Sequence, residues 1–489
     1  MENRIKKFIS NKKKNNSYLI SKKILKNVIN LSNTQSSNLI LKNFSNIFDI
    51  PEEVLKLKYN KLVYNTFSYD KLRFNNKILI INIFKELLKS IIIFLKFIFA
   101  KNNEKIDYYD FIIHGIDDSR SYERYDELIK KFRTSLIISN NKILTKNKKV
   151  SIYKDSKYQA INQEAIKGKK LKIISLFFQI FLQSIISNFN YIYFYNLILF
   201  SIIKNYSIFY NNRGKYFMED RFYNTCSIRN YFFKKFGGLA TSTPQKNIVE
   251  TCISYFVDTD IFFSLANEKF SIKRLREFGG RVDVSVPVGS FFLEHDWYRK
   301  KKDLTKVPKN EILIMGLNPN TWLKMNDLNY KNYEYVCREW IRNISKMYPK
   351  INIMIKHHSN LKDNIYEKKF FKNTNVISLI DDNSNNRSYG YIDRSDITFS
   401  FASTTILEGI SMGKQCYFID PGFGAKNFFY KLNNLNKIRI GSFNKFKKII
   451  KNKLSKKKVN KIYKKNMYCL KSNKVSLRVY NYYTRINYD

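Results

Sequence analysis

The fold of the chain is decided by residues 396–420, which read DITFSFASTTILEGISMGKQCYFID. Ile397, Phe399 and Phe401 alternate with polar residues, as in a strand, and residues 416–419 form a second short apolar run. Between them, the hydroxyl residues 403–405 are good helix N-caps and Gly413 is a good helix stop. The stretch therefore predicts a strand, a short helix and a second strand, which is the repeating unit of a parallel α/β sheet.

The turn between the first strand and the helix is suited to binding an anion. In an open parallel sheet, ligands lie beyond the carboxyl ends of the strands. A helix that begins among Ser403, Thr404 and Thr405 directs unpaired N–H groups and a positive dipole end to that place, which favours a phosphate. Glu408 falls about one turn into the helix, within reach of a sugar hydroxyl. The same residues also fit a structural helix cap followed by a surface glutamate, so the local pattern leaves both interpretations open.

The composition indicates a globular protein with a large excess of positive charge. The chain has 489 residues, of which 44% are hydrophobic, enough for two or three domains. Its net charge of +48 suggests nucleic acid or an anionic membrane as partner. A/T-rich codons also account for much of the lysine, so we take the charge as an indication of an anionic surface rather than of nucleic acid. Five scattered cysteines and four histidines form no metal-binding pattern and indicate a reducing, cytoplasmic setting. The basic N-terminus has no apolar run behind it, so we expect no signal peptide.

Strand and helix patterns alternate along the chain and divide it into two α/β halves. We expect an N-terminal α/β domain with helical insertions over residues 1–298, a linker over 299–310, a C-terminal α/β domain over 311–444 and a basic helical tail over 445–489. Within the first domain, we expect a strand at 108–114 and a helix over 221–236. The apolar regions 78–100 and 171–203 contain charges or amides, so we expect helices that pack in the protein or lie on a membrane rather than one span.

Three motifs occur in a characteristic order. They are Val288-Gly289-Ser290, then Lys356-His357-His358-Ser359 after a strand, then Ser403-Thr404-Thr405 with Glu408 and Gly413-Lys414. Residues 216–422, which contain them, resemble GT-B glycosyltransferases of the bacterial surface-polysaccharide and capsule type. His358 takes the position of the family's histidine, and Ser359 replaces its proline. Gln245-Lys246-Asn247 departs from the Gln-His-Gly that is common in the family.

The resemblance implies two Rossmann-like domains with a deep cleft near the linker, the first for the acceptor and the second for a UDP- or CMP-linked sugar donor. It implies transfer to a surface-polysaccharide or lipid-linked glycan, in the cytoplasm or at the inner face of the cell membrane. No cofactor is expected, and no suitably placed acidic motif for a metal is present. The expected donor-binding residues are Lys356, His358, Ser403, Thr404, Thr405 and Glu408.

An inverting transfer also needs a base that takes the proton of the acceptor hydroxyl. The loop after the strand at 108–114 offers His114, Asp117 and Asp118 as catalytic candidates. Their structural alternatives are a histidine bonded to backbone and a solvated pair of loop caps. Inversion is slightly favoured over retention, because position 400 holds serine where a retaining enzyme often has a second glutamate.

Other functions fit the same sequence. A polyol-phosphate transferase or a nucleotide-sugar epimerase would use the same fold, and only the epimerase would need no acceptor. A nucleic-acid-binding protein would use the positive charge, and its binding would weaken steeply with salt. A non-catalytic relative acting in an assembly would explain the altered loop at 245–247.

Overall fold

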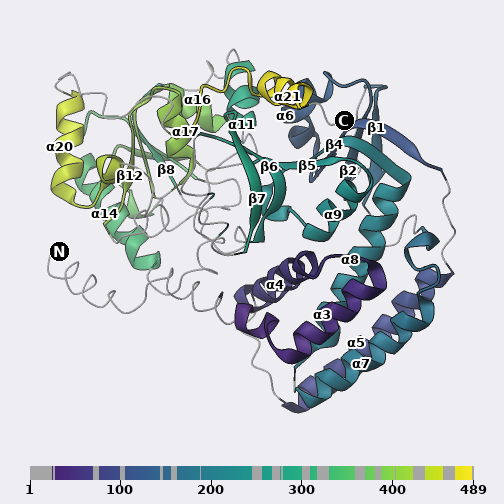
Figure 1. Cartoon of the computed structure of the whole chain (residues 1–489). Coiled ribbons are helices and arrows are strands. Elements are labelled where there is room, and N and C mark those ends of the chain that lie inside the picture. Colours follow the sequence, from purple (N-terminus) through teal and green to yellow (C-terminus); the bar gives the residue numbers. More distant parts are fainter. Residues whose placement is uncertain are drawn as a thin grey trace.

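The computed structural model in Figure 1 contains two parallel β-sheets, each flanked by helices. It describes residues 25, 28–69, 76–99, 105–141, 143, 147–155, 162–187, 189–244, 256–266, 272, 276, 279–299, 309–316, 330–357, 369–379, 387–401, 403–421, 435–454 and 468–486. The expected linker lies mostly outside these residues, as do the loop at 245–247 and His358.

The N-terminal sheet has seven strands in the order β3-β2-β1-β4-β5-β6-β7, and every pairing is parallel. The strands are β1 (Asp107–His114), β2 (Ser135–Ser139), β3 (Val150–Lys154), β4 (Asn212–Glu219), β5 (Leu239–Ser242), β6 (Asp258–Ser264) and β7 (Arg281–Pro287). The chain runs outward from β1 to β3 and then returns to place β4 on the other side of β1. Strand order therefore reverses between β1 and β4, which is the topological switch point of a doubly wound sheet.

The C-terminal sheet repeats this arrangement with six parallel strands in the order β10-β9-β8-β11-β12-β13. They are β8 (Asn310–Met315), β9 (Ile353–Lys356), β10 (Val376–Leu379), β11 (Ser395–Ser400), β12 (Cys416–Ile419) and β13 (Arg439–Ile440). Here the switch point lies between β8 and β11. The prediction of an α/β protein with two Rossmann-like domains is thus confirmed.

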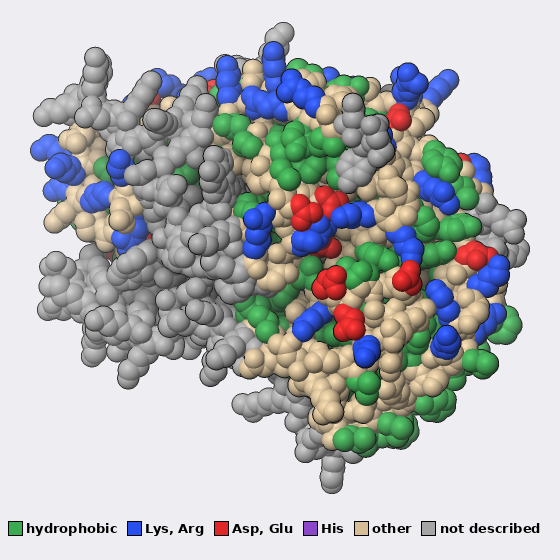
Figure 2. Space-filling view, viewed as in Figure 1, with side chains coloured by type: hydrophobic (Ala, Val, Ile, Leu, Met, Phe, Trp, Pro, Cys, Tyr) green, Lys and Arg blue, Asp and Glu red, His purple; other side chains and the backbone are tan. Residues whose placement is uncertain are grey.

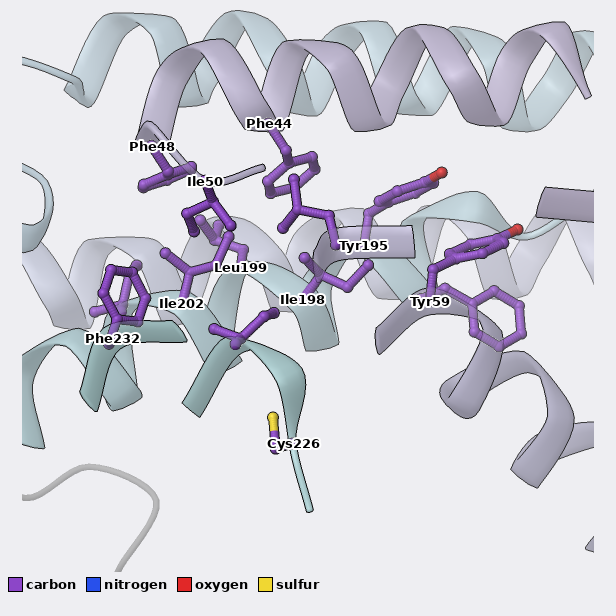
Figure 3. Packing of buried hydrophobic residues seen from close by; sticks show 14 of the residues in the cluster. Phe44, Phe48, Ile50, Tyr59, Tyr195, Ile198, Leu199, Ile202, Cys226 and Phe232 are labelled. Atoms are coloured by element: carbon purple, nitrogen blue, oxygen red, sulfur yellow. The ribbon is translucent and has the colours of Figure 1, made fainter. Parts of the chain in front are cut away.

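A layer of helices covers one face of the N-terminal sheet. It consists of α3 (Gln35–Phe48), α4 (Glu52–Tyr69), α5 (Asn76–Ile98), α7 (Lys170–Ile186), α8 (Tyr191–Asn211) and α9 (Ser227–Lys235). Helix α8 lies at its centre, where Tyr195 stacks on Tyr59 of α4 and on Phe44 of α3 (Figure 3). The region 171–203 thus forms two packed helices, as expected. Among the described helices, only α8 is long and apolar enough to cross a membrane, and 67% of that stretch is buried inside the protein.

The opposite face of the N-terminal sheet is covered by α6 (Ser119–Ile129) and by α21 (Val475–Arg485) near the end of the chain. We expect residues 445–489 to form a basic helical tail, and in the structure the described helices of this stretch pack against the two domains. Phe446 and Ile450 of α20 (Phe443–Leu454) pack into the core of the C-terminal sheet. Tyr483 of α21 is fully buried, and its ring stacks on Tyr216 of β4 with 4.4 Å between centroids.

The helix expected over 221–236 is shorter in the structure. A single 3-10 turn, η3 (Phe222–Asn224), is followed by two non-helical residues before α9 begins at Ser227. Cys226 is extended, and the Thr225 hydroxyl accepts a hydrogen bond from the backbone N–H of Asp258 at 3.1 Å. That tertiary bond to β6 uses the threonine side chain and holds the chain out of the helical path.

Candidate functional site

The strand–helix–strand element predicted for residues 396–420 is present as β11, α17 (Thr405–Ser411) and β12. Ser403 organises the turn, because its backbone N–H donates to the Ser400 hydroxyl at 3.0 Å and its own hydroxyl accepts from Thr405 N–H at 3.3 Å. Thr404 is the residue before the helix and makes no capping bond with its side chain. Gly413 has φ +84°, a conformation that glycine adopts without strain, and ends the helix as predicted.

Glu408 lies in the first turn of α17 and is only 2% exposed. Its carboxylate accepts hydrogen bonds from the Ser290 hydroxyl at 3.2 Å and from the Tyr389 hydroxyl at 2.9 Å. Burial and the adjacent carboxylate raise the pKa of Tyr389 well above its usual value, so the phenol stays protonated and donates. In this structure, Glu408 therefore joins α17 to the N-terminal domain, and its predicted contact with donor hydroxyls stays a prediction.

The turn Val288-Gly289-Ser290 holds the other side of this contact. It follows β7, and Ser290 caps the short helix α11 (Phe291–Leu293) by accepting from Leu293 N–H at 3.3 Å. The Ser290 N–H donates to the Ser472 hydroxyl at 2.9 Å, which ties the turn to the segment before α21. Leu265 after β6 and Leu293 after β7 belong to the same buried hydrophobic cluster as the apolar residues of α17, which follows β11. The carboxyl ends of the two sheets therefore converge on one interface.

The predicted cationic loop begins at the end of β9, next to the switch point of the C-terminal sheet. Lys356 is the last residue of β9 and is buried, with its ammonium 5.8 Å from the centre of the Tyr391 ring. His357 is also buried and lies against the end of β8, where a Cβ on Gly316 would come within 2.8 Å of its Nδ1. The His357 side chain therefore faces the protein interior.

At the switch point of the N-terminal sheet, His114 is held in a buried charged cluster. It ends β1 and pairs in register with Glu219, which ends β4. His114 Nδ1 lies 2.6 Å from Glu219 Oε1, and its Nε2 lies 3.4 Å from Asp155 Oδ2. Arg229 from α9 donates to Glu219 Oε2 at 2.6 Å, and Lys204 from α8 lies 2.5 Å from Asp155 Oδ1. The cluster therefore joins β1, β4 and the residue after β3 to helices α8 and α9.

The charges in this cluster set the protonation of His114. Burial and the positive charge of Arg229 lower its pKa, but Glu219 and Asp155 raise it by more, so the net pKa lies above the usual value. For Glu219, burial raises the pKa, whereas His114 and Arg229 lower it by more. His114 Nδ1 lies near both the Glu219 carboxylate and Arg229 Nη1, the latter at 2.9 Å, so these two groups compete for that nitrogen, while the net direction of the pKa favours the protonated imidazole. With 8% of its surface exposed, His114 can hold or release a proton at the carboxyl edge of the sheet.

The two aspartates predicted beside His114 have different environments. Asp118 is the N-cap of α6 and accepts from Ser121 N–H at 2.6 Å, which matches its structural alternative. Asp117 precedes it in the loop, where its backbone carbonyl accepts from the Asn141 side chain at 2.8 Å. The structure gives neither aspartate a contact with His114, so of the three candidates only His114 joins the charged cluster.

Sequence reasoning missed the partners of His114. Glu219 is not among the predicted site residues, although parallel strands that are neighbours at a switch point place their last residues together. Arg229 and Lys204 come from helices, and their sequence carries no signal that they point at β1. Among the described residues, no group of three His, Cys, Asp or Glu side chains could hold a metal ion.

Comparison with known proteins finds similarity only to solved structures. No protein-family model and no curated protein sequence matches the chain. UDP-GlcNAc 2-epimerase from Neisseria meningitidis, bound to UDP-GlcNAc, is 11% identical with a TM-score of 0.44 and covers 78% of this chain and 100% of its own. The epimerase from Methanocaldococcus jannaschii is 10% identical with a TM-score of 0.46, covering 77% and 100%. A variant of the wall teichoic acid polymerase TagF is 11% identical with a TM-score of 0.47, covering 83% and 97%.

Proposed function

We propose that the chain is a glycosyltransferase that moves a sugar from a nucleotide-activated donor to a surface-polysaccharide or lipid-linked glycan. The observation that carries this proposal is the meeting of two doubly wound sheets at their carboxyl ends. Each sheet would bind a ligand at its switch point. One switch point has the hydroxyl turn at Ser403, and the other has the His114–Glu219 pair. A donor and an acceptor bound on the two sides would face each other.

On the donor side, the groups near the switch point suit a diphosphate. The hydroxyls of Ser403 and Thr405 are 3.1 Å apart at the carboxyl end of β11. Lys356 is the last residue of β9, which is separated from β11 in the sheet by the single strand β8. Hydroxyl donors and a cation stabilise the negative charge that grows on a leaving nucleoside diphosphate. We assign Thr404 and His358 to the same proposed site. Glu408 would join it by exchanging its hydrogen bonds to Ser290 and Tyr389 for hydrogen bonds to sugar hydroxyls.

On the acceptor side, His114 with Glu219 would act as the base. As the acceptor oxygen bonds to the anomeric carbon, the bond from that carbon to the diphosphate breaks and the hydroxyl proton passes to the imidazole. Because the pKa of His114 is raised, the neutral base forms only as the pH rises through that pKa. The rate of transfer should therefore increase with pH over this range. A single attack from the face opposite the leaving group gives inversion.

The test is binding and turnover of nucleotide sugars by the full chain. UDP-GlcNAc, the ligand in one similar structure, is the first probe, followed by other UDP- and CMP-linked sugars. Binding is measured by calorimetry, and products are identified by NMR with and without a glycan acceptor. Transfer releases the nucleotide only when an acceptor is present, whereas epimerisation needs no acceptor and leaves the nucleotide attached. Failure of every nucleotide sugar to bind would overturn the proposal.

Ser403→Ala provides the site-specific variant, and Ser442→Ala is its matched control. Ser442 caps α20 in the same domain, accepting from Lys445 N–H at 3.3 Å, as Ser403 accepts from Thr405. A lost hydrogen bond to a charged phosphate is worth about 1.5–3 kcal/mol, so Ser403→Ala should weaken donor binding about tenfold or more. Ser442→Ala should bind the donor as the wild type does. Equal effects of the two variants would remove the donor site from this turn.

A further inference from the structure

Helices α5 and α7 present a broad apolar surface to solvent. On α5 and just beyond its end, the exposed side chains include Ile81, Leu88, Ile92, Leu95 and Phe99, the last with 80% of its surface accessible. On α7 they include Leu171, Phe178, Leu182 and Ile186, with exposed fractions from 56% to 82%. Successive members on each helix are three, four or seven residues apart, so each set follows one helix face.

The two apolar faces belong to neighbouring helices at the edge of the molecule. Phe84 of α5 contacts Phe181 of α7 with 5.1 Å between ring centres, and Phe94 contacts Phe177 at 5.8 Å. The opposite sides of both helices are buried in the core of the helical layer. Figure 1 shows α5 and α7 side by side, farthest from the sheet, and Figure 2 shows hydrophobic side chains along this edge. A contiguous exposed apolar surface of this kind marks a binding surface rather than ordinary scatter.

Lysines lie beside the apolar faces. Lys85 and Lys89 on α5 and Lys170 and Lys172 on α7 are all exposed. Glu86, an acidic residue in this part of α5, pairs with Lys89 at 3.2 Å. An apolar helix face bordered by lysine suits the boundary between lipid headgroups and acyl chains when the lipids are anionic. A second copy of the chain fits less well, because a two-fold contact would bring the same lysines toward each other.

We propose that this α5–α7 surface docks the protein on an anionic lipid bilayer, with the helices lying in the plane of the headgroups. The apolar side chains would enter the outer acyl region, and the lysines would contact lipid phosphates. The proposal does not rest on the donor site, which uses other elements of the structure. It assigns membrane contact to helices α5 and α7, whereas in the sequence the lysine-rich region after residue 445 is the more obvious candidate.

The experiment is co-sedimentation of the full chain with phosphatidylcholine vesicles, with and without 30% phosphatidylglycerol. The wild type should bind the anionic vesicles, and more weakly as salt increases. Replacing Leu88, Ile92 and Leu182 together with serine should reduce binding at least tenfold. The matched control replaces Val284, Met347 and Ile377, which are similarly exposed on other elements, and should bind like the wild type. Circular dichroism confirms that each variant is folded.

A second pair of variants tests the charge. Lys85→Gln and Lys172→Gln should each weaken binding to anionic vesicles about fivefold and leave binding to neutral vesicles unchanged. Absence of wild-type binding to anionic vesicles would overturn the proposal, as would equal binding by the serine variant and its control. Light scattering of the lipid-free protein tests whether a second copy of the chain binds this surface. A dimer that the serine variant abolishes would assign the surface to that second copy and not to lipid.

Discussion

Replacing Glu219 with glutamine should destabilise the protein strongly, because it breaks a buried ion pair from one side. The Glu219 carboxylate is fully buried and lies 2.6 Å from the Arg229 guanidinium, whose side chain is also mostly buried. The same carboxylate contacts His114. Removing one partner of a buried pair leaves the other charge without compensation and costs about 3–5 kcal/mol. The free energy of unfolding of a typical domain is about 5–15 kcal/mol. A loss of this size from a single substitution should therefore be easy to measure.

The assay is urea unfolding followed by circular dichroism, with the change read from the midpoint and slope. The control is Glu164→Gln, which removes a carboxylate 2.9 Å from Lys167 in an exposed pair. Exposed pairs contribute about 0–1 kcal/mol, so the control should hardly move. A second readout is NMR titration of the imidazoles. With only four histidines in the chain, His114 can be assigned by substitution, and Glu219→Gln should lower its pKa relative to the wild type.

Two results would refute this reasoning. A loss of stability in Glu219→Gln no greater than in Glu164→Gln would mean that water or rearrangement satisfies Arg229. A pKa of His114 that stays constant or rises in the variant would mean that Glu219 is not the group that raises it. The second result would also remove the physical basis for His114 as the proposed proton acceptor.

Three further predictions concern pH, a turn and the C-terminal helix. Folding raises the pKa of His114 above 6.5, so its contribution to stability is complete below pH 6.5 and is lost as the pH rises through the raised pKa. The urea concentration at the unfolding midpoint should therefore fall more with increasing pH for the wild type than for His114→Gln. Gly289→Ala should cost about 1–3 kcal/mol, because φ is +101° and the new Cβ would lie 2.8 Å from Ser472 Oγ; Gly168→Ala, with φ +68° and open space, should cost less in the same unfolding assay. Tyr483→Ala should cost about 3–5 kcal/mol by thermal melting, whereas the partly exposed Leu477→Ala on the same helix should cost far less; equal effects would mean that α21 is not part of the N-terminal core.

The sequence alone was sufficient for the fold class and for the strand–helix–strand element at residues 396–420. Strands and helices of the C-terminal half follow local rules: alternation in β11, hydroxyl residues before α17 and a glycine after it. These signals lie within a few residues of one another, so they can be read without knowing what the chain packs against. The same locality explains the correct position of β1.

Only the tertiary structure decided which charged groups meet. His114, Asp155, Lys204, Glu219 and Arg229 come from five separate segments, and each contact depends on strand register or on how the helical layer sits against the sheet. Likewise, Glu408 could be predicted at the first turn of its helix, but not its burial against Ser290 and Tyr389. The sequence determines periodicity and capping, which are local, whereas the pairing of distant polar groups is set by the packing that buries them.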